Sequence, residues 1–321
     1  MSEAAVCCVC QRALEPDDVR TLGGRTFCAA HYQRVANDHR PHALPIVYAV
    51  GAVVLFAGLF TLISAVVNVP RTGVGLLLLS LLMALTPAVI WLYAFYQEDR
   101  IEPEPKRYVL GVAALAALLA QAIGQPAIRG LFRVQDWTHE SPLIGLLGSI
   151  FIVGFVQEFA KYAAVRYTIF YSEEFDERAD GILYGAAAGL GYATLLNVSY
   201  VLENNGVHLG TGAVQVSVNA LAHASFGGVM GYFLSRAKFE SMGPIWLPLG
   251  LILVSVLDGA VTFALRELPL LGGLGYRPWY GLVLAAAVAG VTFYVLFAIS
   301  ERLNRAITAE LKGATAPAAA I

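Results

Sequence analysis

The sequence predicts an all-α protein that crosses a membrane about eight times and carries a small zinc-binding module at its amino terminus. Three observations lead to this fold class. Of the 321 residues, 58% are hydrophobic and only 14% are charged, whereas an ordinary soluble domain has about 25% charged residues. Uninterrupted apolar runs of about 20 residues recur, and each can cross the roughly 30 Å hydrocarbon layer. All four cysteines lie within the first 28 residues.

Eight apolar runs are predicted to form the membrane helices. Their lengths fit a rise of about 1.5 Å per residue, and none shows the strict two-residue alternation of a membrane β-barrel. They lie at residues 46–69, 73–96, 108–128, 142–165, 181–202, 211–235, 244–265 and 278–300. We therefore divide the chain into a cytoplasmic zinc-binding module (1–40), a multi-helix membrane domain (41–305) and a disordered carboxyl-terminal tail (306–321).

The positions of Lys and Arg predict that both termini lie in the cytoplasm. With the amino terminus inside, fifteen basic residues fall in cytoplasmic segments and five on the opposite side, while Lys161 lies inside a span. Cytoplasmic loops retain basic residues because translocating them is unfavourable. The first 45 residues contain no apolar segment followed by a cleavage site, so we expect no secretory signal. A formal net charge of −2 argues against a nucleic-acid partner.

The amino-terminal cysteines have the spacing of a zinc site. Cys7-x2-Cys10 and Cys28-x2-His31 form two chelating pairs separated by seventeen residues, and thiolates and imidazole are typical zinc ligands. Cys8 is an alternative to Cys7 as a ligand, and a flexible tail with unrelated thiols is the alternative to a site. The pattern resembles LIM-like and treble-clef zinc modules. It implies a closed structural site that shapes a surface for a cytoplasmic protein partner.

Three charged residues lie well inside the predicted spans, namely Glu158, Lys161 and Asp258. Each intramembrane charge costs about 2.5 to 3.5 kcal/mol on insertion scales, so these residues are the first candidates for function. The sixth predicted span adds His223, and the fifth adds Asn197. Glu158, His223 and Asp258 would bind a divalent metal or activate a water if their helices face one another.

Simpler structural explanations exist for the same residues. Glu158 and Lys161, three positions apart on one helix, can form an internal ion pair that only locks two helices together. His223 can form an ordinary interhelical hydrogen bond. Asp258 has no partner nearby in sequence, so it either stays protonated or meets His223 or Lys161 across the bundle.

Four segments, in this order along the chain, look like the motifs of the PrsW family of intramembrane peptidases. They are residues 97–105 (QEDRIEPEP), Gln157-Glu158-x2-Lys161, residues 180–197 (DGILYGAAAGLGYATLLN) and His223. The resemblance covers about residues 46–300. It implies relatedness to CAAX-processing and Abi-type membrane proteases, membrane-tethered substrates such as an anti-sigma factor, and a bacterial inner membrane as the location.

The sequence departs from the family pattern at three polar positions. The first glutamate of the family's Glu-Glu-x2-Lys motif is Gln157, and the glutamate of its Phe-x3-Glu motif is Leu196. Asp258 aligns with the position at which the family usually has a second histidine. Glutamine cannot take a proton from water, and leucine can neither bind a metal nor accept a hydrogen bond.

Two functional hypotheses follow from the resemblance and the departures. In the first, the chain is a membrane-embedded peptidase: Glu158 is the base or a metal ligand, Lys161 orients it, His223 and Asp258 are ligands, and Asn197 polarises the scissile carbonyl. In the second, it is a catalytically impaired relative that binds membrane-protein helices and signals through its zinc module. A small-solute transporter is a third hypothesis, which the absence of an inverted repeat disfavours.

Overall fold

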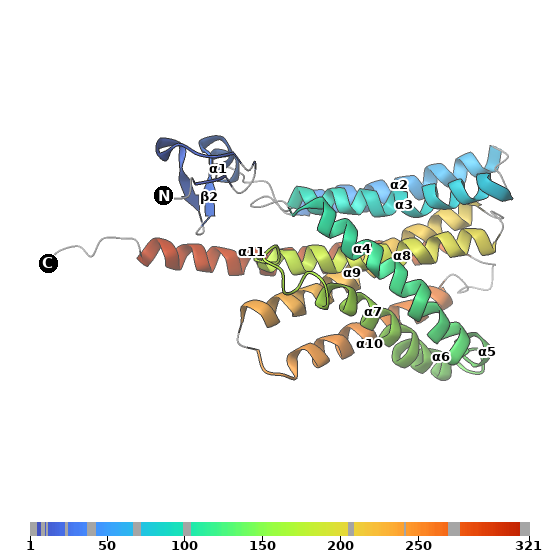
Figure 1. Cartoon of the computed structure of the whole chain (residues 1–321). Helices are drawn as coiled ribbons and strands as arrows, with labels where there is room; N and C mark the ends of the chain where they lie inside the picture. Colours follow the sequence, from blue (N-terminus) through green and yellow to red (C-terminus); the bar gives the residue numbers. More distant parts are fainter. Residues whose placement is uncertain are drawn as a thin grey trace.

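A computed structural model of the chain describes residues 5–7, 10, 12–22, 25–36, 43–66, 72–98, 104–204, 209–240, 242–268 and 277–314. The described part is a long bundle of helices with a small module beside one end (Figure 1). Some sequence predictions fall outside these residues: Cys8 as a ligand, residues 99–103 of the segment 97–105, and the tail 315–321.

The amino-terminal module contains a β-hairpin followed by a short helix. Strand β1 (Arg20–Leu22) pairs antiparallel with β2 (Arg25–Phe27), so that Thr21 lies opposite Thr26. A 3-10 turn, η1 (Pro16–Asp18), precedes the hairpin, and helix α1 (Ala29–Ala36) follows it. The second chelating pair of the sequence therefore lies where β2 leads into α1.

The membrane domain is helical throughout its described part, which confirms the predicted fold class. Its helices are α2 (Ala43–Val66), α3 (Gly73–Glu98), α4 (Lys106–Leu119), α5 (Val134–Trp137), α6 (Pro142–Gly148), α7 (Phe155–Arg166), α8 (Arg178–Glu203), α9 (Leu209–Phe239), α10 (Trp246–Glu267) and α11 (Pro278–Ala314). Seven helical segments of the described chain are long and apolar enough to span a membrane. Helix α9 covers the remaining predicted span but is not among the seven.

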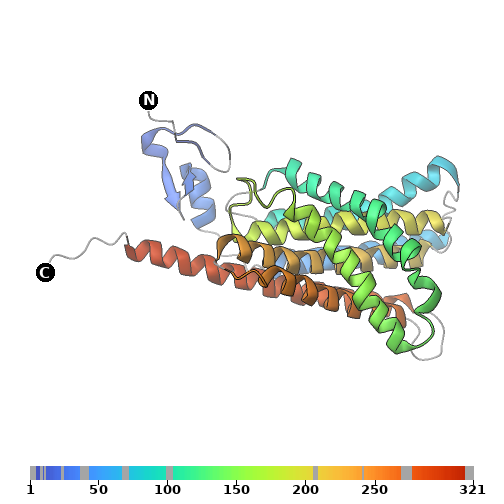
Figure 2. The ribbon, with the colours of Figure 1, turned by 60° about the horizontal axis from the view of Figure 1, so that its bottom comes forward.

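Helix α9 differs from the other predicted spans because polar side chains recur along it. These include Ser217, Asn219, His223 and Ser225. At the far end of the domain, α11 continues to Ala314, so residues 306–314 of the predicted tail are helical. Figure 2 shows α11 running along the bundle and ending on the same side as the amino-terminal module.

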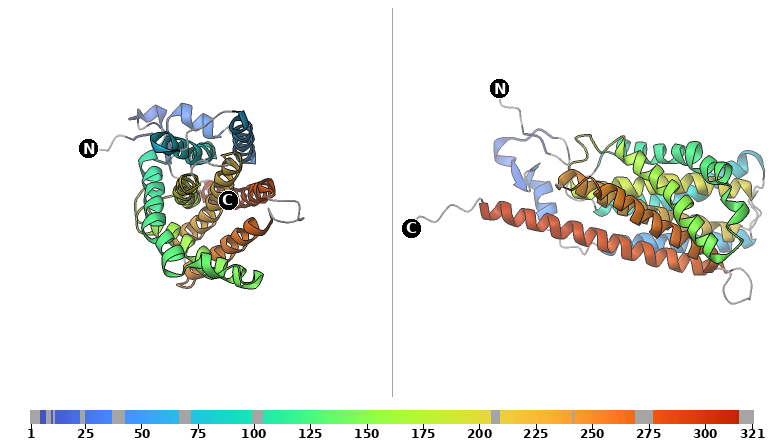
Figure 3. Two further views of the ribbon diagram at one scale, coloured as in Figure 1. Left: turned by 90° about the vertical axis from the view of Figure 1, so that its right-hand side faces the viewer. Right: turned by 90° about the horizontal axis from the view of Figure 1, so that it is seen from below.

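Helix α8 is the centre of the bundle. In its most apolar stretch 78% of residues are buried, against 22% to 39% in the other six apolar spans. Seen end-on, it lies inside a ring of the other helices (Figure 3). Helices α8 and α9 approach backbone to backbone because glycines face one another: a Cβ added to Gly185 would lie 2.2 Å from the Gly227 carbonyl oxygen.

Three π-helical stretches interrupt the helices around α8. They are η2 (Ala120–Gly124), η3 (Pro126–Leu131) and η4 (Ser149–Gly154). Pro126 has no amide hydrogen to donate to the preceding turn, which accounts for the irregular hydrogen bonding beside it. Helix α7, which carries Glu158 and Lys161, begins directly after η4. Such π-helical insertions are frequent at functional sites.

Candidate functional site

Glu158, His223 and Asp258 lie together in the interior of the bundle. They come from α7, α9 and α10, and each offers one ligand atom such that all three atoms lie within 4.8 Å of one another. Their exposed fractions are 0%, 5% and 1%. The three helices therefore face one another as the peptidase hypothesis requires, and we call these residues with Lys161 the buried cluster.

Lys161 occupies the middle of the buried cluster. Its ammonium forms an ion pair with the Glu158 carboxylate, lies 3.1 Å from Nδ1 of His223, and is 3.9 Å from Oδ2 of Asp258. Because an ammonium can only donate, Nδ1 of His223 must accept and the proton of the neutral ring is assigned to Nε2. The internal ion pair of the simpler explanation is thus present, but it is part of a larger arrangement.

Several buried polar atoms near the cluster have no hydrogen-bond partner among the described residues. They are Oε1 of Gln157, Oε2 of Glu158, the hydroxyl of Tyr192 and Oδ2 of Asp258. Leaving such atoms unpaired in an apolar interior costs free energy, so they indicate a place for a water, an ion or a substrate group. Asp258 uses its other oxygen, Oδ1, which accepts a long hydrogen bond of 3.4 Å from Thr262.

Tyr192 is a residue of this site that the sequence analysis did not assign. It is fully buried, its ring centre lies 5.4 Å from that of His223, and the ammonium of Lys161 lies 5.8 Å from its ring centre. The hydroxyl fits only because residue 124 is a glycine, where an added Cβ would lie 2.4 Å from it. The available signal was a tyrosine at the phenylalanine position of the Phe-x3-Glu motif.

Asn197 and Leu196 do not join the buried cluster through any described hydrogen bond. The Asn197 side chain donates to the Val216 carbonyl at 3.0 Å and accepts from Asn219 at 2.8 Å, so it ties α8 to α9 one turn away from His223. Leu196 packs with Tyr192 in a small apolar group that also contains Ala120 and Ala160. An apolar contact thus stands where the family pattern has a carboxylate.

The close backbone contact between α8 and α9 fixes the position of His223 in the bundle. A Cβ added to Gly189 would lie 2.0 Å from the carbonyl oxygen of His223 itself. The same glycine row continues along the helix pair, where a Cβ on Gly231 would lie 1.7 Å from the Gly181 carbonyl oxygen. Backbone contact, rather than a side chain that can rotate away, therefore positions the imidazole.

A second acidic group lies at the start of α8. Glu104, Asp176 and Asp180 have carboxylate oxygens within 4.8 Å of one another. The Tyr184 hydroxyl donates to Glu104 at 2.5 Å, and Asp180 accepts the backbone amide of Asp176 at 2.8 Å. Burial raises the pKa of Glu104 to about 7. Glu104 belongs to the segment 97–105, and Asp180 and Tyr184 belong to the segment 180–197, whereas Asp176 lies just before α8. The hydrogen bond from Tyr184 to Glu104 fastens the start of α4 to α8.

The predicted zinc ligands also come together. Cys7, Cys10, Cys28 and His31 each offer a ligand atom, and the four atoms lie within 4.8 Å of one another. No disulfide joins these three cysteines, of which Cys7 and Cys28 are buried and Cys10 is exposed. This amino-terminal group is far along the chain from the buried cluster and shares no residue with it.

The membrane domain matches known proteases. The model of the PrsW family, described as intramembrane metalloproteases, matches residues 104–288, which include the whole buried cluster but not the amino-terminal module. The protease PrsW of Bacillus subtilis (strain 168) is 29% identical over 205 residues, covering 62% of this chain and 90% of the relative. The protease PrsW of Halalkalibacterium halodurans is 31% identical over 176 residues, covering 53% and 75%.

A shorter match has a similar level of identity. The protease PrsW of Geobacillus kaustophilus (strain HTA426) is 32% identical over 154 residues, covering 48% of this chain and 64% of the relative. No solved structure matches this chain. The site described above therefore has to be understood from its own geometry.

Proposed function

We propose a function from one premise: this chain belongs to the PrsW family of intramembrane metalloproteases. The function is hydrolysis of a peptide bond in a membrane-tethered protein, such as a single-span anti-sigma factor, at the buried cluster. The observation that carries the proposal is the convergence of Glu158, His223 and Asp258 from three helices inside the membrane domain. Intramembrane charges are costly, and they are retained mainly where they act or pair.

Glu158 is the proposed general base. Its Oε1 is held by the ammonium of Lys161, while its Oε2 has no hydrogen-bond partner among the described residues. An anchored carboxylate with one free oxygen is suited to take a proton from a water and later return it to the leaving amine. Lys161 orients this base. The hydroxyl of Tyr192, also without a described partner, can donate to a substrate carbonyl.

The buried cluster fits a divalent metal in its donor chemistry. One ligand atom from each of two carboxylates and one imidazole lies within 4.8 Å of the others, and one oxygen of each carboxylate has no hydrogen-bond partner among the described residues. His223 and Asp258 would hold such an ion together with Glu158, whose Oε2 would then be a ligand instead of the base. The ion when bound would polarise a carbonyl and activate a water. Lys161 already supplies a positive charge to the same groups, so the ammonium and a metal would compete for them.

A catalytically impaired relative is the second candidate function. The observation that favours it is the loss of two carboxylates: Leu196 packs against the apolar group around Tyr192, and Gln157 cannot act as a base. Such a protein would bind a membrane-protein helix without cutting it and signal through its amino-terminal module. We further propose a bacterial inner membrane as the location, with both termini in the cytoplasm, from the family and from the distribution of basic residues.

The test compares new protein termini in cells that carry the wild type or Glu158→Gln. We expect termini near the membrane spans of one or a few single-span proteins with the wild type and their absence with Glu158→Gln. Gly290→Ala, at a glycine where an added Cβ meets nothing within 4 Å, is the matched control and should behave as the wild type. Identical termini in all three strains would refute the peptidase and leave the binding protein.

A further inference from the structure

We propose that the amino-terminal module is a structural zinc site with Sγ of Cys7, Cys10 and Cys28 and Nδ1 of His31 as its four ligands. This site goes beyond the proposed peptidase function, since it shares no residue with the buried cluster and lies outside the region that matches the protease family. The argument rests on the geometry of the four ligand atoms, on the size of the module's core, and on the contacts that hold the two chelating pairs.

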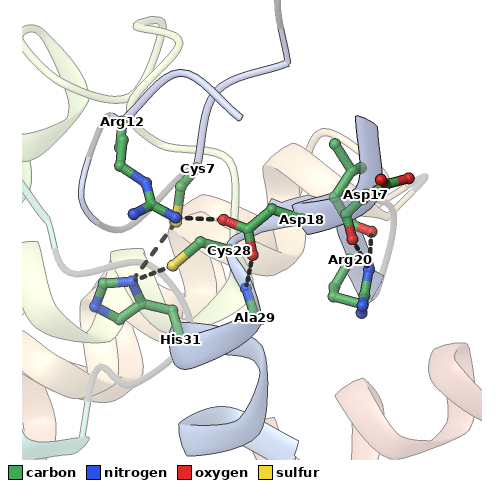
Figure 4. A network of polar contacts seen from close by, with 9 residues as sticks. Cys7, Arg12, Asp17, Asp18, Arg20, Cys28, Ala29 and His31 are labelled. Carbon is green, nitrogen blue, oxygen red and sulfur yellow. Dashed lines mark hydrogen bonds and ion pairs between the residues drawn. The ribbon is translucent and has the colours of Figure 1, made fainter. Parts of the chain in front are cut away.

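The distances from the His31 nitrogen to two of the sulfurs are close to those of a tetrahedral site. Zinc lies about 2.3 Å from sulfur and about 2.0 Å from nitrogen, so sulfur and nitrogen at two corners of a tetrahedron are about 3.5 Å apart. The observed separations from Nδ1 of His31 are 3.7 Å to Sγ of Cys7 and 3.1 Å to Sγ of Cys28. Figure 4 shows both sulfurs pointing to the same nitrogen.

The backbone produces this geometry without distortion. Cys28 follows β2 directly and His31 lies in the first turn of α1, so one tight turn presents both residues on the same side. On the other side of the site the Cys7 amide donates to the Arg12 carbonyl at 2.9 Å, and the ligand atoms of Cys7 and Cys10 both lie within 4.8 Å of those of Cys28 and His31. Four protein ligands fill all four positions of a tetrahedral ion, which is typical of a structural site and leaves no position for a substrate.

Asp18 links the segments that carry the two chelating pairs. The Asp18 carboxylate accepts the backbone amide of Ala29 at 3.0 Å through one oxygen and pairs with the Arg12 guanidinium through the other (Figure 4). Arg12 follows the first pair, and Ala29 lies between Cys28 and His31. The carboxylate therefore connects the two turns that carry the ligands. Such supporting contacts orient the ligands of metal sites.

The apolar core of the module is too small to stabilise it alone. Among the described residues, its cluster of buried residues contains Cys7, Leu14 and Cys28, with Ala5 and Val19 packed against them, and Phe27 is the one large side chain of the described module that is also fully buried. Domains below about 40 residues usually need a metal, disulfides or oligomerisation to fold. No disulfide joins the three described cysteines, and two of them belong to this core. Zinc binding thus supplies the folding free energy that burial does not.

The first experiment measures zinc in the full-length protein purified in detergent under reducing conditions. We compare a parent protein that carries His223→Ala with the same protein carrying Cys28→Ser or Cys7→Ser in addition. Cys8→Ser in the same parent is the matched control, because it makes the same chemical change at a neighbouring thiol. His223→Ala is present in all four proteins so that metal bound by the buried cluster does not contribute. We expect one zinc per chain in the parent and in Cys8→Ser, and at least a tenfold loss in Cys7→Ser and Cys28→Ser.

Cobalt substitution checks the ligand set. The parent loaded with Co²⁺ should show the absorption of a tetrahedral ion with thiolate-to-metal charge transfer, and His31→Ala should weaken it. If Cys8→Ser loses zinc while Cys7→Ser retains it, the ligand assignment is wrong. If the parent and Cys28→Ser contain equal zinc, or the parent contains none, the site is refuted. None of these results depends on proteolytic activity, so they stand apart from the peptidase proposal.

A chelator experiment keeps the proposal testable if the serine variants cannot be purified. Removing zinc from the purified parent should make the first 42 residues sensitive to a soluble protease, while the membrane helices from α2 onward stay intact. Restoring zinc should restore resistance. Equal sensitivity with and without the chelator would overturn the claim that zinc folds the module.

Discussion

Replacing Gly189 by alanine tests how the structure positions His223. Residue 189 lies on α8 where that helix touches the α9 backbone, and an added Cβ would lie 2.0 Å from the His223 carbonyl oxygen. Ordinary contacts begin at 3.4 Å, so the two backbones would have to separate by about 1.4 Å. No side-chain rotation can relieve this clash because both partners are backbone atoms or attached directly to the backbone.

The clash has an energetic and a functional consequence. Overpacking of a well-packed interior typically costs about 1 to 3 kcal/mol, which exceeds the gain of about 0.5 to 1 kcal/mol from replacing glycine in a helix. A movement of about 1.4 Å would also take Nδ1 of His223, now 3.1 Å from the Lys161 ammonium, out of hydrogen-bond range. We expect Gly189→Ala to lower the melting temperature and to reduce cleavage at the buried cluster.

The assay is thermal unfolding of the purified protein in detergent, followed by the comparison of protein termini described above. Gly290→Ala is the control because an added Cβ at Gly290 meets nothing within 4 Å. It should melt at the wild-type temperature or slightly above. If Gly189→Ala has the same melting temperature as the control and forms the same products, the backbone contact does not hold His223 in place.

Three further predictions concern single side chains. Lys161→Met leaves two carboxylates buried without their counter-charge, which costs about 3 to 5 kcal/mol of stability. Added divalent metal should therefore raise the melting temperature of Lys161→Met more than that of the wild type. Equal increases in the two proteins would exclude competition between the ammonium and a metal. Tyr192→Phe removes a buried hydroxyl that lacks a described partner, so we expect unchanged or higher thermal stability together with slower cleavage, and a clear loss of stability would show that the hydroxyl has a structural partner. Glu104 holds its proton to about pH 7 when folded, against an ordinary value of 4.5, so its contribution to stability is complete below about pH 4.5 and is lost as the pH rises through 7. At pH 8, Glu104→Gln should therefore have a higher melting temperature than the wild type, and at pH 4.5 the two melting temperatures should be equal. Equal melting temperatures of the two proteins at both pH values would contradict the burial of this carboxyl.

The membrane class and most span positions followed from sequence because hydrophobicity and length are local properties. The predicted run at 142–165, for example, corresponds to the described apolar span Pro142–Arg166. Helix α9 is the exception: Asn219 bonds to Asn197 of α8, His223 belongs to the buried cluster, and Ser217 and Ser225 are fully buried. Hydropathy measures composition and does not report which side of a helix faces the bundle.

The composition of the buried cluster followed from the cost of intramembrane charge, but its internal contacts did not. Lys161 was expected to pair with Glu158, whereas its contact with His223 depends on how α7 and α9 are rotated. The same holds for Tyr192, whose position beside His223 depends on the close contact of α8 with α9. Asn197 was predicted to act on the substrate carbonyl, and its hydrogen bonds to α9 make that role a prediction still to be tested.

The most direct test of the central claim uses purified protein in liposomes with the substrate found by the comparison of termini. The reaction is run in water enriched in heavy oxygen, and the products are weighed by mass spectrometry. Hydrolysis at the buried cluster predicts one heavy oxygen in the new carboxyl group with the wild type and no product with Glu158→Gln. The same labelled product with Glu158→Gln would show that Glu158 and its cluster do not cut the substrate.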